Sequence, residues 1–245
     1  MIPKVIHYCW FGNNPLPPLA IKCIDSWKKF LPDYEIKRWD ETNFNVNIIP
    51  YTAEAYEAGK YAFVSDFARF WILYHEGGLY FDTDVEIIKP IDDIIKKGSF
   101  MGCEQDANQN GGTIMVAPGL GLGCPSEMKL YATFLDFYTT AHFKNSDGSY
   151  NIKNIVQYTT ELLLKEGLEN KGGIQFVKGV YIYPREYFCP INNVTKKMKK
   201  TPNTRTIHHY VGSWRDKSRF ERFKESIRKY LPDWLLLYYN KKKWK

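Results

Sequence analysis

Hydrophobic residues recur at every third or fourth position over residues 61–76, which is the spacing of one face of a helix. Gly77 and Gly78 follow, and glycines commonly end helices. A short apolar run at 79–81 then predicts a buried strand, stopped by polar residues. The apolar stripe of the helix consists of Phe63, Phe67, Phe70 and Tyr74.

The beginning of the chain predicts a strand at 5–10, a helix at 19–30 and a second strand at 34–39. The loop between the first two contains Gly12 and three prolines. An alternation of strand, helix and strand favours an α/β fold with parallel pairing. Further strands are predicted at 85–88, 113–116 and 180–183, further helices at 130–140 and 155–165, and a polar loop at 196–205.

Charge is concentrated at the C-terminal end. Residues 215–245 contain 11 Lys or Arg and 4 Asp or Glu, whereas residues 1–214 contain 23 of each kind. The formal net charge of +7 therefore belongs to the last 31 residues. This distribution predicts a neutral globular domain, residues 1–214, followed by a basic and aromatic helical tail, residues 215–245.

Several classes of protein are disfavoured. No run of 18 apolar residues predicts a transmembrane helix, and the first residues lack the pattern of a secretory signal. The five cysteines are odd in number and have no CxxC spacing, which disfavours a disulfide framework or a structural zinc site. We therefore expect a protein of the reducing cytosol.

Asp82 and Asp84 follow the predicted strand at 79–81. Two carboxylates one residue apart at a sheet edge suit Mg²⁺ or Mn²⁺, which prefer oxygen ligands and could bridge to a diphosphate. The plain alternative is a strand end with two solvated acids. The helix and the two glycines immediately before the strand favour a site.

Asp66 and Arg69 are three residues apart on the predicted helix 61–76 and share a face. They could form a surface ion pair contributing about 0–1 kcal/mol. The functional interpretation is a carboxylate that holds sugar hydroxyls, oriented by the arginine, whose fork suits fixed hydrogen bonding.

Two further groups could complete a site. Trp10 lies at the predicted carboxyl end of the first strand, where ligands of open α/β sheets bind; it could stack on a nucleobase or belong to the core. His208 and His209 could supply an imidazole to a metal held by carboxylates, and the indole N–H of Trp214 could donate to a phosphate.

These segments together closely resemble glycosyltransferase family 32, the DXD-type sugar transferases of bacterial capsule and lipopolysaccharide synthesis with yeast mannosyltransferase relatives. More remotely, they are similar to the large clostridial glucosylating toxins. The match is dense over residues 1–95 and returns at 207–214. The segments are IHYCWFG at 6–12, YAFVSDFAR at 61–69, GGLYFDTD at 77–84 and HHYVGSW at 208–214.

The resemblance implies a GT-A type nucleotide-diphospho-sugar transferase fold, α/β with a mixed, mainly parallel central sheet. It implies Mn²⁺ or Mg²⁺ as cofactor. In the metal site, Asp84 would bind directly, Asp82 through water while also reaching the ribose, and His209 would be the last ligand, with His208 as the alternative.

The resemblance also implies a nucleotide-sugar donor, a UDP-sugar before GDP-mannose. Asp66 and Arg69 would contact the donor sugar, and Trp214 would hydrogen-bond the leaving diphosphate. The remaining donor contacts carried over are Trp10 on the base, Tyr80 near the nucleotide, and Asn110 and Gly111 at the sugar.

The predicted function is a metal-dependent retaining glycosyltransferase that moves a hexose, galactose, glucose or an N-acetyl form, to a polysaccharide or an undecaprenyl-linked oligosaccharide. The alternative is an inactive relative that binds nucleotide sugar or glycan. Basic and aromatic residues interleave in 215–245, which suits an anionic membrane surface; a tail packed on the domain is the other interpretation. We therefore expect a cytoplasmic protein, peripheral at the inner face of the bacterial plasma membrane, that binds no nucleic acid.

Overall fold

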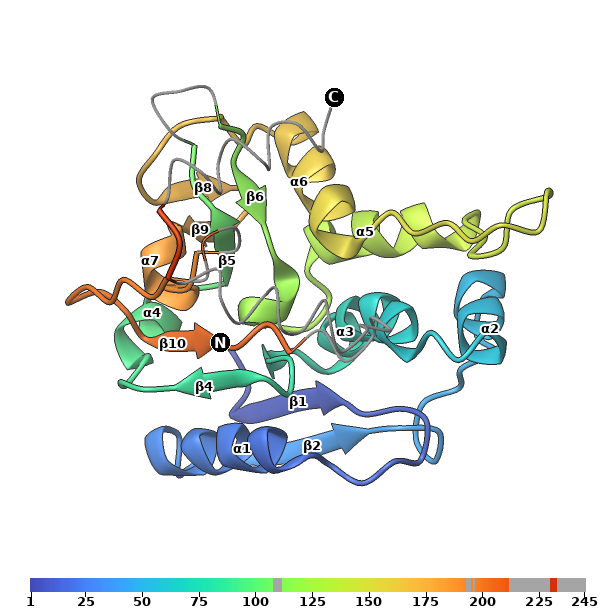
Figure 1. The fold of residues 1–245 in the computed structure, drawn as a ribbon, viewed down its shortest axis with the longest axis horizontal. Coiled ribbons are helices and arrows are strands. Elements are labelled where there is room, and N and C mark those ends of the chain that lie inside the picture. Colours follow the sequence, from blue (N-terminus) through green and yellow to red (C-terminus); the bar gives the residue numbers. More distant parts are fainter. Residues whose placement is uncertain (108–111, 193–194, 196, 212–229, 233–245) are drawn as a thin grey trace.

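The computed structural model describes residues 1–107, 112–192, 195, 197–211 and 230–232 (Figure 1). Within them the chain folds around one large sheet with the strand order β2-β1-β3-β7-β5-β9-β8, and β6 pairs with β5. A small two-stranded sheet joins β4 (Val85–Ile87) to β10 (Thr206–His208). The strands of the large sheet are β1 (Val5–Cys9), β2 (Glu35–Trp39), β3 (Gly78–Tyr80), β5 (Phe100–Gln105), β6 (Met115–Val116), β7 (Leu122–Cys124), β8 (Gln175–Val177) and β9 (Val180–Tyr183).

The large sheet is mixed. β1 is parallel to β2 and β3, and β5 is parallel to β9. β7 runs antiparallel to both β3 and β5, so β3 and β5 point the same way. β2, β1, β3, β5 and β9 therefore share one direction, and β6, β7 and β8 oppose it. The predicted mixed and mainly parallel α/β sheet is confirmed.

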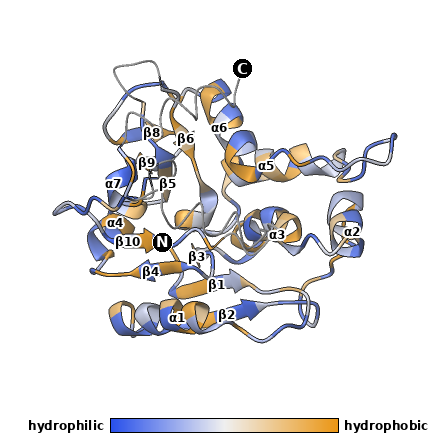
Figure 2. Cartoon of the chain, in the orientation of Figure 1, coloured by the Kyte–Doolittle hydropathy of each residue, from blue (hydrophilic) through white to orange (hydrophobic). Residues whose placement is uncertain are grey.

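Helices cover both faces of the sheet. One core packs α2 (Pro50–Glu57), α3 (Tyr61–Glu76), α5 (Lys129–Thr139) and α6 (Ile155–Lys165) against one face. The other core packs α1 (Pro18–Phe30), α4 (Asp92–Lys97), α7 (Arg185–Phe188) and β4 against the opposite face. In Figure 2, β1 is largely hydrophobic, whereas the long connection between α5 and α6 is hydrophilic toward its tip.

Alternation along the central strands assigns residues to the two cores. Leu79 of β3 belongs to the core beneath α1, and its neighbour Tyr80 belongs to the core beneath α3. Successive side chains of a strand point to opposite faces, so a strand covered on both faces is apolar throughout. The apolar run at 79–81 and the run at 5–10, which is apolar or aromatic apart from His7, have this physical origin.

The predicted helices at 19–30, 61–76, 130–140 and 155–165 are all present, within one residue at each end. Several short elements were not predicted, because they lack a long periodic pattern in the sequence: α2, α4, α7, β5, β7, β8 and β10. All five cysteines are buried, and none of them forms a disulfide. No helix of the described part is long and apolar enough to cross a membrane. The tail, 215–245, lies almost entirely outside the described residues.

His7 joins the middle of the sheet to the end of α3. Its ring is fully buried, and Trp39 on β2 donates its indole N–H to Nδ1 at 3.0 Å. Because Nδ1 accepts, Nε2 carries the proton of the neutral ring and donates to the carbonyl of Gly77 at 3.0 Å. Burial lowers the pKa of His7 to about 4, although Glu76 and the Gly77 carbonyl oppose this effect.

We therefore predict a loss of stability in acid that depends on His7. The folded-state pKa of His7 lies below the unfolded value of 6.5. The contribution of His7 to the free energy of unfolding is therefore complete above pH 6.5 and is lost as the pH falls toward 4. The free energy of unfolding should fall by about 3 kcal/mol, because each unit of difference between the two pKa values contributes about 1.4 kcal/mol. Urea unfolding of the wild type and His7→Gln between pH 7 and 4.5 measures it.

The variant His75→Gln, which removes an exposed histidine of α3, is the control and should keep the wild-type pH dependence. An equally steep acid loss in His7→Gln would assign the effect to other groups.

Candidate metal centre

The two aspartates of the DTD segment lie in the turn between β3 and β4, at the carboxyl end of β3. The turn is closed by a hydrogen bond from the Val85 N–H to the carbonyl of Asp82 at 3.0 Å. β10 pairs antiparallel with β4, with His208 opposite Val85. This pairing brings a segment more than 120 residues away in sequence beside Asp84.

Both carboxylate oxygens of Asp84 have partners from the end of β10. Oδ1 lies 3.0 Å from His208 Nε2, and Oδ2 accepts the backbone N–H of Val211 at 3.0 Å. Burial opposes ionisation of this carboxyl, but His208 and the Val211 N–H together hold the pKa of Asp84 below its usual value. The same contact raises the pKa of His208 despite its burial.

Asp82, Asp84 and His208 each offer one ligand atom, and the three atoms lie within 4.8 Å of one another. Two carboxylate oxygens and an imidazole nitrogen suit Mn²⁺, and the carboxylates suit Mg²⁺. In addition, Nδ1 of His208 is buried and has no hydrogen-bond partner among the described residues. The donor set therefore fits a divalent cation.

The two histidines of the HHY segment have different partners. His209 Nε2 contacts Glu86 Oε2 at 2.9 Å, and Lys22 pairs with the same carboxylate at 3.0 Å. The geometric cluster thus contains His208, which the sequence analysis held as the alternative, while the favoured His209 lies beside Glu86. Which of the two consecutive histidines reaches Asp84 depends on the register of β10 on β4, and the sequence alone does not specify that register.

Arg69 of α3 is the buried cation behind the aspartates. Its side chain is 4% exposed and contacts Asp66 Oδ1 at 2.9 Å and Asp82 Oδ1 at 3.4 Å. The helix face that Asp66 and Arg69 share is therefore buried, and their contact is not a surface ion pair. Burial raises the pKa of Asp66 to about 7, although Arg69 lowers it; the neighbouring Asp82 raises it further.

Tyr80 and Gly119 complete the surroundings of Asp82. Tyr80 is buried, and the Arg69 guanidinium carbon lies over its ring, 5.1 Å from the ring centre. The Tyr80 hydroxyl donates to Asp82 Oδ1 at 3.1 Å. The Gly119 carbonyl accepts the Asp82 N–H at 3.0 Å. A Cβ on Gly119 would overlap Asp82 Oδ2, so only glycine leaves room for this carboxylate. Gly119 was not among the residues predicted from the sequence, because no local pattern marks its contact with Asp82.

Trp10 follows β1 at its carboxyl end, as predicted. It is half-buried, and its indole N–H donates to the carbonyl of Asn14 at 2.6 Å, within the loop that follows β1. Since β1 and β3 are parallel neighbours, Trp10 and Asp82 leave the sheet at the same edge. Asn110, Gly111 and Trp214 lie outside the described residues, so their predicted roles stay predictions.

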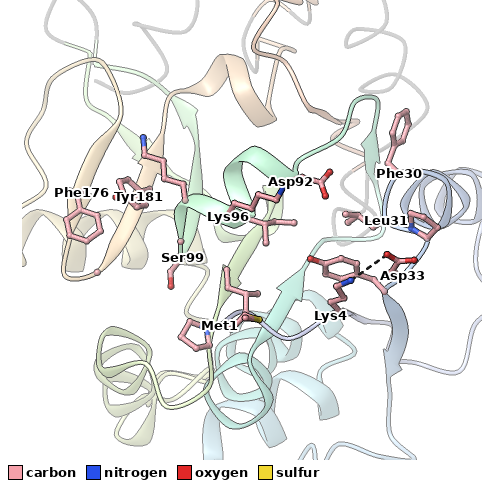
Figure 3. A pocket seen from close by; sticks show the side chains of 18 residues that line it. Met1, Lys4, Phe30, Leu31, Asp33, Asp92, Lys96, Ser99, Phe176 and Tyr181 are labelled. Carbon is pink, nitrogen blue, oxygen red and sulfur yellow. Dashed lines mark ion pairs between the residues drawn. The ribbon is translucent and has the colours of Figure 1, made fainter.

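A groove of about 800 Å³ lies at the other edge of the sheet (Figure 3). Its lining includes Lys4, Tyr34 and Ser99, each immediately before β1, β2 or β5. These positions are the amino ends of parallel strands, whereas Asp82 follows the carboxyl end of β3. The groove is therefore separate from the metal centre.

Residues 17–101 match the family model described as a glycosyltransferase sugar-binding region containing a DXD motif. The match spans Asp66 and Arg69 of α3 together with Asp82 and Asp84. The resemblance predicted from the motifs is confirmed for this part of the chain.

Curated relatives match part of the chain. Inositol phosphoceramide mannosyltransferase 1 of Schizosaccharomyces pombe is 29% identical over 111 residues, which cover 41% of this chain and 33% of the relative. An uncharacterized glycosyltransferase of Acanthamoeba polyphaga mimivirus is 34% identical over 106 residues, which cover 41% of this chain and 42% of the relative. Each match covers less than half of the relative. Among solved structures, the PaToxG glycosyltransferase is 21% identical, with a TM-score of 0.49 over 68% of this chain and 70% of that one.

The two adjacent histidines provide a matched pair of variants. We expect His208→Ala to weaken Mn²⁺ binding and His209→Ala to leave it much closer to wild type, because only His208 lies within ligand distance of Asp84 and Asp82. Titration of Mn²⁺ followed by electron paramagnetic resonance measures the affinity of each protein directly. The opposite order of effects would assign the metal ligand to His209.

Proposed function

We propose that this chain is a metal-dependent glycosyltransferase with a GT-A type fold that uses a nucleotide-sugar donor. One observation carries the proposal: Asp82, Asp84 and His208 converge at the carboxyl edge of the sheet. The two aspartates belong to the segment that matches the DXD sugar-binding model. Ligands of α/β folds bind at this edge, and hard oxygen ligands there suit a metal ion that would bind a diphosphate.

The residues around the centre are suited to hold the donor. The position of Trp10 at the same edge supports stacking on the nucleobase. One oxygen of Asp66 is held by Arg69, and the Asp66 side chain is buried. A carboxylate fixed in this way can accept hydrogen bonds from sugar hydroxyls without first losing its own freedom. Asn110, Gly111 and Tyr80 remain proposed donor contacts, with Tyr80 acting through Asp82.

Asp84 and His208 would hold the cation directly, and Asp82 would hold it directly or through water. A bound divalent cation supplies positive charge that offsets the negative charge growing on the departing diphosphate. Trp214, by family resemblance, donates its indole N–H to that diphosphate. Arg69 stays behind the carboxylates and fixes Asp66 and Asp82 as the sugar–oxygen bond breaks.

The donor is proposed to be a UDP-hexose, the reaction to retain anomeric configuration, and the acceptor to be a polysaccharide or an undecaprenyl-linked oligosaccharide of capsule or lipopolysaccharide synthesis. These choices rest on the family resemblance. The name of the fission-yeast relative makes a mannose donor the main competitor.

A screen of nucleotides tests the proposal. A ligand that binds only the native state raises the apparent stability by RT ln(1 + [L]/Kd). UDP, GDP, UDP-galactose, UDP-glucose, their N-acetyl forms and GDP-mannose, each with and without Mn²⁺, are compared by thermal shift and calorimetry. We expect binding of UDP or a UDP-sugar that depends on Mn²⁺, followed by release of UDP when acceptor is added.

A preference for GDP would move the donor to mannose. Binding without turnover would favour the alternative, an inactive nucleotide-sugar or glycan-binding relative. No nucleotide binding in the presence of Mn²⁺ would refute the transferase and would leave an inactive, glycan-binding relative as the better interpretation.

The basic tail is proposed to bind an anionic membrane surface at the cytoplasmic face, where a lipid-linked acceptor would lie. Residues 215–245 carry the whole net charge of +7, and each Lys or Arg near such a surface contributes about 1 kcal/mol. Removal of 215–245 should sharply reduce sedimentation with vesicles that contain anionic lipid, and added salt should do the same to the full chain. Unchanged partitioning of a folded, truncated protein would refute the membrane contact.

A further inference from the structure

Tyr210 has an unusual backbone. Its φ is +52°, in the left-handed region that residues other than glycine, asparagine and aspartate seldom adopt. A tyrosine in this conformation is strained, and such strain persists where the surroundings hold it in place. The residue comes directly after His208 and His209, at the end of β10.

The turn at Tyr210 determines where the chain goes next. The His209 N–H donates to the carbonyl of Asp84 at 3.0 Å, which continues the pairing of β10 with β4. After the left-handed residue, the Val211 N–H points back to Asp84 and donates to Oδ2 at 3.0 Å. Backbone groups on both sides of Tyr210 thus bind the same aspartate, one at its carbonyl and one at its carboxylate.

The side chain of Tyr210 fixes the other proposed ligand. Its ring lies 4.2 Å from the ring of His208, tilted by 57°. The hydroxyl lies 2.8 Å from Cys189 Sγ, at the end of α7. Burial raises the pKa of the Cys189 thiol to about 12, so this contact joins two neutral groups. Tyr210 therefore links the HHY segment to α7 while its ring rests against the imidazole.

We propose that Tyr210 is a positioning residue of the metal centre, which holds Asp84 through the left-handed turn and His208 through its ring before the cation binds. The inference rests on the proposed metal-dependent function and adds to it a residue that contacts the two ligands without being one. Residues behind metal ligands commonly change metal affinity by about 10–100-fold when they are replaced.

Three substitutions separate the turn from the ring. Tyr210→Asn removes the ring but tolerates a left-handed backbone. Tyr210→Val removes the ring and, being β-branched, disfavours that backbone. Tyr210→Phe keeps the ring and removes only the hydroxyl contact with Cys189. Tyr187→Phe is the matched control, because Tyr187 lies on the neighbouring α7 and packs on Tyr183 at 5.0 Å.

The measurement is Mn²⁺ affinity of the full chain by electron paramagnetic resonance, with thermal unfolding recorded for every variant. We expect Tyr210→Val to weaken binding by about 10–100-fold, Tyr210→Asn to lose less, Tyr210→Phe to lose least, and Tyr187→Phe to match the wild type. A purely structural role would lower the unfolding temperature of the variants while leaving Mn²⁺ affinity of the folded protein unchanged.

If the wild type binds Mn²⁺ and the folded Tyr210 variants bind it equally tightly, this inference is overturned and the proposed function stands. Equal losses in the asparagine and valine variants would overturn the role of the turn. A wild-type chain that binds no Mn²⁺ would refute the metal centre itself, and the inference with it. If Tyr210→Val does not fold, the asparagine and phenylalanine variants still decide the question.

Discussion

A buried arginine organises the site. Arg69 is almost fully enclosed, yet its guanidinium stays charged, so the fold must supply compensating charge close by. Asp66 on the same helix and Asp82 after β3 provide it. Removing one partner of such a buried group leaves an uncompensated charge. The free energy lost in that way is much larger than the net stability that the intact pair contributes. The position of Asp82 is consequently tied to the packing of α3 and not to a flexible loop.

Backbone segments that pack closely against Asp82 and Asp84 also hold these two side chains in place. Asp82 is held at its N–H by Gly119 and at its carboxylate by Tyr80, and the missing side chain of Gly119 leaves the space that the carboxylate fills. Asp84 is held by the end of β10. A proposed metal centre built in this way has its ligands arranged by folding, which lowers the cost of organising them when an ion arrives.

Sequence reasoning succeeded where a single segment contains the whole signal. The long helix 61–76, the strand that follows it and the DTD turn are contiguous, and the 3.6-residue period and the paired glycines describe them almost completely. The shared face of Asp66 and Arg69 follows from helix geometry alone. Its burial does not, because it depends on β3 and the 118–120 turn closing over the helix.

The features that were not predicted depend on contacts between distant segments. Which histidine reaches Asp84 is decided by a three-residue strand, β10, whose pairing with β4 has no periodic pattern in either segment. A shift of one residue in that register would bring His209 to the position of His208 and turn His208 to the opposite face. The left-handed backbone of Tyr210 is also invisible in sequence, since tyrosine gives no sign of it.

The geometry of Asp84 sets the terms on which a cation would bind. Its Oδ1 contacts His208 Nε2 at 3.0 Å, and its Oδ2 accepts the Val211 N–H. A cation that takes both Asp84 and His208 as ligands must replace their mutual contact with two metal–ligand bonds, and the imidazole must be neutral to supply a lone pair. The Val211 contact needs no such exchange, because the second carboxylate oxygen can keep its hydrogen bond. The backbone after Tyr210 can therefore hold Asp84 in one orientation with and without the ion, while His208 changes its partner.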